Sequence, residues 1–154
     1  MTRRMSFTLG VVAAVALSTA AVASEVAPDA VEFTDDGVTM SLTGTAGDPA
    51  AGADVFKNKS LGNCLACHAN AAMAKEQFHG NVGPSLDGVA SRWDEAQLRA
   101  IVVDSKKALS DETVMPGFYS MNVGQHVAEK FVDKTILTAQ QVEDVVAYLG
   151  TLKE

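Results

Sequence analysis

The sequence is poor in cysteine, in basic residues and in long apolar runs. Cys64 and Cys67 are the only two cysteines in 154 residues, so no other pairing competes with them and no further thiol remains to act as a nucleophile. Twelve Lys and Arg residues face nineteen Asp and Glu residues, which gives a formal charge of −7. Without a basic cluster to offset this charge, a nucleic-acid partner is excluded.

The one continuous apolar run lies near the start of the chain, over residues 7–20. It follows Arg3 and Arg4 and precedes the small residues 21–23. A short basic region, an apolar stretch and a small-x-small site are typical of a cleavable secretory signal peptide, predicted here as residues 1–23. A retained anchor is the alternative, but the run is short for a span of about 20 residues, so no membrane association is expected after cleavage.

The two cysteines belong to the pentapeptide Cys64-Leu65-Ala66-Cys67-His68. This spacing is typical of the attachment site of one haem c, in which each thiol adds to a vinyl group and the histidine ligates the iron. One helical turn brings both cysteines to the same side. A thioredoxin-like redox pair or a small disulfide is the alternative, but it gives His68 no role. Haem attachment normally follows export, so the predicted compartment is the bacterial periplasm.

The part of the chain after the signal peptide divides into an extension, residues 24–47, and a domain, residues 48–154. In the extension, apolar residues alternate on both sides of the turn 34–37, and its Asp-Gly pair is typical of a short hairpin. A lone hairpin is marginal in water. The extension is therefore expected to lie on its own domain or on a partner subunit, and the sequence leaves both open.

Helix caps are predicted at Asp48, Asp94 and Thr138. The middle helix is expected to end at about Asp104. The last helix carries apolar residues at i, i+3, i+4 and i+7, and it is expected to cross the first helix near Gly52.

The second axial iron ligand must come from residues far enough from His68 to reach the opposite face of the haem. Met115 is the preferred candidate, because its thioether is a soft ligand suited to haem iron. The proline that follows it fixes the backbone and so limits the positions that the sulfur can reach. Met121, His79 and His126 remain as alternatives. A histidine and a methionine together would fill both axial positions, which suits electron transfer and leaves no open site for a substrate.

Pro84 is a further candidate, because a ligating histidine usually needs an acceptor for its second ring nitrogen. We expect the Pro84 carbonyl to accept from Nδ1 of His68. An ordinary Gly-Pro turn is the alternative, and the residues alone favour it.

The sequence resembles class I cytochromes c over residues 48–152. The resemblance is carried by Gly52-x-x-x-Phe56, Cys64-x-x-Cys67-His68, Gly83-Pro84, Met115-Pro116 and residues 145–149. It implies an all-α, class I cytochrome c-like domain around one haem c, with crossing terminal helices. It also implies Pro84 as the carbonyl partner of His68 and Met115 as the distal ligand.

A narrower resemblance is to the SoxX family, the mono-haem subunits of SoxAX cytochromes, through residues 41–49, 83–90 and 136–149. It implies a heterodimer with a SoxA-like haem subunit that joins thiosulfate to a cysteine of a SoxYZ-like carrier, an L-cysteine S-thiosulfotransferase reaction. This chain would pass electrons to a downstream cytochrome c acceptor and would not itself be catalytic. An independent electron shuttle and a haem enzyme with an open iron site are the alternatives.

Overall fold

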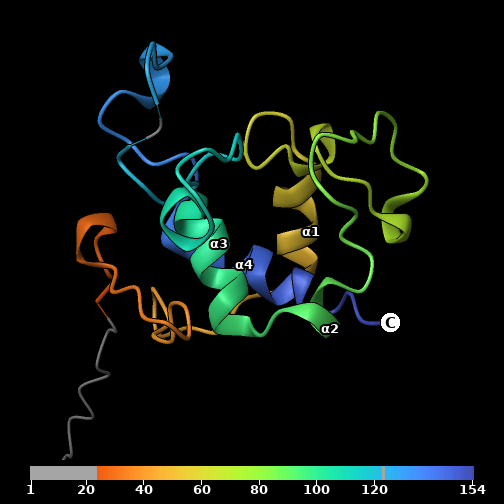
Figure 1. The fold of residues 1–154 in the computed structure, drawn as a ribbon, viewed down its shortest axis with the longest axis horizontal. Coiled ribbons are helices and arrows are strands. Elements are labelled where there is room, and N and C mark those ends of the chain that lie inside the picture. Colours follow the sequence, from red (N-terminus) through yellow and green to blue (C-terminus); the bar gives the residue numbers. More distant parts are fainter. Residues whose placement is uncertain (1–23, 123) are drawn as a thin grey trace, which may run out of the picture.

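The computed structural model describes residues 24–122 and 124–154, so the predicted signal peptide lies outside the described residues. Over this part the chain is all-α, as predicted, with short 3-10 turns between the helices (Figure 1). The helices are α1 (Pro49–Lys57), α2 (Val89–Arg92), α3 (Glu95–Ala108) and α4 (Ala139–Leu149). None of the helices described is both long and apolar enough to cross a membrane.

Helices α1 and α4 cross at Gly52, as predicted. A Cβ atom at Gly52 would lie 1.9 Å from the carbonyl oxygen of Asp144, so only glycine lets the two backbones approach this closely. Next to this crossing, the rings of Phe56 and Tyr148 pack edge to face with centroids 5.3 Å apart. The crossing therefore fixes α4 against α1, the helix that directly precedes the segment with Cys64 and Cys67.

The caps of the helices form as the sequence predicts. The carboxylate of Asp48 accepts from the first amides of α1, and α3 and α4 each begin with a complete capping box. In these boxes Asp94 pairs with Gln97, and Thr138 pairs with Gln141. Each box satisfies two amides that the helix itself leaves without partners.

The expected hairpin in residues 24–47 is reduced to one isolated bridge between Thr34 and Gly37. The reason is that the following backbone finds its partners on α3. The amide of Val38 donates to the Ala96 carbonyl at 3.0 Å, and the Val38 carbonyl accepts from Arg99 at 3.0 Å. The extension therefore lies on its own chain, which was one of the two expected placements.

A buried ion pair holds α3, α4 and the extension together. The side chains of Arg99 and Glu143 are each 4% exposed, and two guanidinium nitrogens donate to the two carboxylate oxygens at 3.0 Å. The same carboxylate accepts from the amide of Leu42 at 2.7 Å. Although burial opposes its charge, the hydrogen bonds that its guanidinium donates to the carboxylates of Glu143 and Glu95 raise the pKa of Arg99 above its ordinary value. Removing one member of such a pair leaves the other charge buried without its partner, which strongly destabilises the fold.

Candidate functional site

A cavity of ≈ 710 Å³ opens between the Cys64–His68 turn and the segment that contains Met115. Its volume lies within the range of about 300–1,000 Å³ that is usual for cofactor sites. Most of its wall is apolar, and α1, α3 and α4 contribute Phe56, Leu98, Val102, Val145 and Leu149 among other residues. Cys64, Cys67, His68, Pro84 and Met115 all line it, so the structure brings together every site residue that the sequence predicted.

The two cysteines lie on a tight turn. The 3-10 segment Cys64–Ala66 begins after Asn63, whose φ of 49° starts the turn in the left-handed region. The amides of Cys67 and His68 both donate to the Cys64 carbonyl, at 3.1 and 2.9 Å. Both thiols are free, and burial raises the pKa of the Cys64 thiol to about 12. The turn therefore presents two cysteine sulfurs and one imidazole to the same cavity.

The ring of His68 is fixed from one side by residues 83–84. Its Nδ1 atom lies 2.7 Å from the Pro84 carbonyl oxygen. Because a carbonyl only accepts, Nδ1 carries the proton and Nε2 is the atom left for a metal. A Cβ atom at Gly83 would lie 2.3 Å from Cε1 and 2.6 Å from Nδ1 of the ring. Glycine is thus required here by space.

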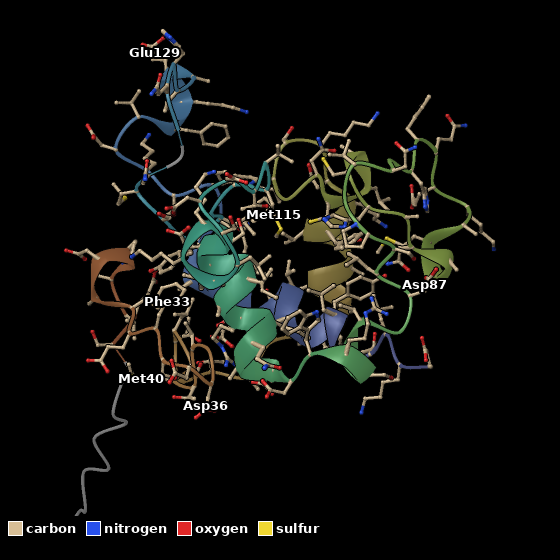
Figure 2. All side chains as sticks on the ribbon, in the orientation of Figure 1. Phe33, Asp36, Met40, Asp87, Met115 and Glu129 are labelled. Carbon is tan, nitrogen blue, oxygen red and sulfur yellow. The ribbon has the colours of Figure 1, made fainter. Side chains whose placement is uncertain are left out.

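The loop that carries Pro84 folds back along the cysteine turn. The amide of Gly80 donates to the Leu65 carbonyl at 2.7 Å, and the amide of Gly83 donates to the Cys67 carbonyl at 2.9 Å. Asp87, labelled in Figure 2, accepts from a backbone amide of this loop at 2.7 Å. That bond, followed by one from a serine hydroxyl, lowers the pKa of Asp87.

A buried side-chain contact ties this loop to α4. Asn70 is fully buried, and its Nδ2 donates to the hydroxyl of Tyr148 at 2.7 Å. Its backbone amide donates to Nδ1 of His79, and Nε2 of His79 lies 3.1 Å from the Met73 carbonyl. Both nitrogens of His79 are therefore engaged within the loop, which does not favour it as an iron ligand.

Met115 reaches the cavity from the segment after α3 (Figure 2). It is half-buried and packs against the core, whereas Met121 is 50% exposed and His126 is exposed. Among the described residues, the cavity lining includes neither Met121 nor His126. The geometry therefore favours Met115 over the alternatives.

The donor set fits a haem. Two thiols in a Cys-x-x-Cys turn, an imidazole with a fixed tautomer and a soft thioether all border one apolar cavity. Apolar walls would bury the disc of a porphyrin, and the thiols would hold it covalently.

Sequence reasoning missed the contacts that support this site. The Gly83-Pro84 motif gives no sign that Gly83 is needed for space beside the His68 ring, and nothing in the sequence predicts the buried hydrogen bond between Asn70 and Tyr148. The sequence carries little signal for either, because each depends on segments that only the folded chain brings together.

Comparison with known proteins identifies the family. The cytochrome c family model matches residues 49–153. A chain in the crystal structure of SoxXA from P. pantotrophus is 42% identical, with a TM-score of 0.78, and the match covers 85% of this chain and 100% of that one. No match was found among curated proteins.

Two more distant structures were also found. Ferric cytochrome c-550 from Paracoccus versutus is 22% identical, with a TM-score of 0.39, and the match covers 70% of this chain and 99% of that one. Cytochrome c2 from Paracoccus denitrificans is 23% identical, with a TM-score of 0.40 and coverage of 70% and 97%. The family match and the 42% identity over most of the chain establish that this protein belongs to the cytochrome c family, as a SoxX-type member whose cofactor is haem c held through Cys64 and Cys67.

Proposed function

We propose that this chain is the periplasmic electron-transfer subunit of a SoxAX-like heterodimer. The complex would oxidatively join thiosulfate to a cysteine of a SoxYZ-like carrier, and this chain would pass the electrons to a downstream cytochrome c. The 42% identity to a chain of SoxXA supports the partner. Because Cys64 and Cys67 are the only cysteines, this chain has no thiol left to react with thiosulfate.

The observation that carries an electron-transfer role is the pair of donors on different walls of one cavity. His68 and Met115 would hold the iron of a bound haem, and the Pro84 carbonyl is the hydrogen-bond partner of His68. When bound, the haem supplies a one-electron couple. The Pro84 carbonyl holds His68 in one tautomer and one ring orientation, and the apolar side chains exclude water. With both residues bound to it, the iron would have no site left for a substrate.

A pull-down with haem staining tests the partner. Tagged protein from thiosulfate-grown cells should retain a second, larger haem-staining polypeptide. Recovery of a stable monomer without a haem-containing partner would contradict the heterodimer.

Two methionine variants test the ligand assignment. The ferric protein should show the weak long-wavelength absorption of a thioether bound to ferric iron. We expect Met115→Ala to abolish this band and Met121→Ala, the matched control on an exposed side chain, to keep it. The opposite result would transfer the assignment to Met121.

An independent electron shuttle is a second candidate, since residues 24–47 bond to the rest of their own chain. The backbone of Val38 bonds to α3, the amide of Leu42 donates to Glu143, and the Val26 carbonyl accepts from the hydroxyl of Tyr119. If the chain is an independent shuttle, deleting residues 24–47 should leave its redox behaviour and its binding of partners unchanged. If it is a subunit of the heterodimer, the full chain should bind a larger haem-containing protein.

A further inference from the structure

Helix α3 is interrupted one turn before its end. Asp104 has φ −153° and ψ 93°, which is far from helical geometry, although helix continues on both sides. The interruption frees the carbonyls of Val102 and Val103 from their usual helical partners. They accept instead from the amides of Phe118 and Tyr119, each at 3.1 Å. The backbone just after the Met115 segment is thereby bonded to α3.

The residue after the interruption holds the other end of the same segment. Ser105 is completely buried, and its Oγ donates to the Met115 carbonyl at 2.6 Å. Next to it, the ammonium of Lys106 donates to the carbonyl of Thr113 at 2.7 Å and to that of Asp111 at 3.1 Å. The Met115 segment is therefore bonded to α3 before, at and after the methionine.

We propose that Ser105 is a positioning residue for Met115, holding the methionine backbone where its thioether can reach the iron. The inference rests on the proposed ligand role of Met115. A methionine side chain has three rotatable bonds, and a mobile backbone would add still more positions for its sulfur, so fixing the backbone narrows the range that the thioether samples. Fixing the carbonyl lowers the entropy lost on ligation, and this favours the closed iron over an open one.

Competition with an external ligand measures that preference. Imidazole binds ferric iron only where the methionine has left, so its apparent affinity reports how firmly the thioether is held. We expect Ser105→Ala holoprotein to bind imidazole about two- to tenfold more tightly than wild type, which corresponds to one lost hydrogen bond. The thioether band should weaken at a lower imidazole concentration.

Ser120→Ala is the matched control. Ser120 is also buried, and its hydroxyl accepts from the amide of Asn122 at 3.2 Å, beyond the part of the segment bonded to α3. It should leave imidazole affinity at the wild-type value. An unchanged affinity in Ser105→Ala, or an equal change in both variants, would overturn the proposal. If Ser105→Ala yields no folded holoprotein, Lys106→Leu tests the same mechanism without adding a thioether, because the Lys106 ammonium holds the carbonyls of Thr113 and Asp111 in this segment. The same increase in imidazole affinity is expected, and an unchanged affinity would overturn the claim that bonding to α3 holds the Met115 segment for ligation.

The Met115→Ala arm separates this proposal from the ligand assignment. If that variant keeps the thioether band, Met115 is not the ligand and both proposals fail. If it loses the band while Ser105→Ala binds imidazole like wild type, the ligand assignment stands and only the positioning role fails.

Discussion

Replacing Gly83 with alanine tests how the His68 ring is held. The new methyl group would lie 2.3, 2.6 and 2.8 Å from Cε1, Nδ1 and Nε2 of the ring. All three distances are well inside van der Waals contact. The ring has little freedom to retreat, because Nδ1 is bonded to the Pro84 carbonyl at 2.7 Å and we assign Nε2 to the iron. Either the ring or the 83–84 backbone must therefore move.

The cost follows from these two effects. Forcing one extra methyl group into a packed site costs about 1–3 kcal/mol. Losing the bond between Nδ1 and the Pro84 carbonyl adds about 0.5–1.5 kcal/mol. We therefore expect Gly83→Ala to lower the free energy of unfolding by about 1.5–4.5 kcal/mol.

The assay is guanidinium unfolding of the ferric holoprotein, followed by haem absorbance. Gly150→Ala is the matched control, because a Cβ there would lie 3.4 Å from the carbonyl oxygens of Ala147 and Val146, an ordinary contact, and its φ is −60°. That substitution should be neutral or stabilise by about 0.4–1 kcal/mol. If Gly83→Ala matches wild type and the control in its unfolding midpoint, the close packing of residues 83–84 on His68 is refuted.

Three further predictions concern the surrounding framework. Arg99→Met leaves the buried carboxylate of Glu143 without its partner and should cost about 3–5 kcal/mol in denaturant unfolding, whereas replacing both residues with apolar ones should cost less. Tyr148→Phe removes the acceptor of the buried Asn70 amide and should cost about 1–3 kcal/mol in the same assay. The lowered pKa of Asp87 means that its stabilisation is present above its ordinary value of 3.8 and is lost as pH falls through the lowered value. Asp87→Asn should therefore be less stable than wild type at about pH 6, and the difference should shrink as the pH falls below 3.8, whereas a constant difference would contradict this reasoning.

Local signals in the sequence were sufficient for α1, α3 and α4 and for the haem attachment turn, whereas the short helix α2 was not predicted. The caps at Asp94 and Thr138 depend on residues three positions apart, so they are legible without the fold. The same holds for Cys64-x-x-Cys67-His68. The small residue at Gly52 also predicted the crossing of α1 and α4 correctly.

Contacts between segments far apart in the chain could not be predicted from the sequence. The extension shows the alternating apolar residues of a hairpin. The backbone N–H and C=O of Val38, which a hairpin would pair across its two strands, bond instead to Ala96 and Arg99 of α3. Asp104 was expected to end the middle helix, and it does break the helix, but α3 continues to Ala108. The hydrogen bond from Ser105 to the Met115 carbonyl depends on that continuation of α3, and no pattern in the sequence predicts it.

Exposure of the reduced holoprotein to carbon monoxide at neutral pH tests the central claim most directly. The claim is that His68 and Met115 fill both axial positions and make the chain an electron conduit. It predicts that the reduced spectrum stays unchanged under carbon monoxide, while Met115→Ala binds the gas readily. Ready binding to the wild-type protein would contradict the closed site and favour a haem enzyme or a small-ligand sensor.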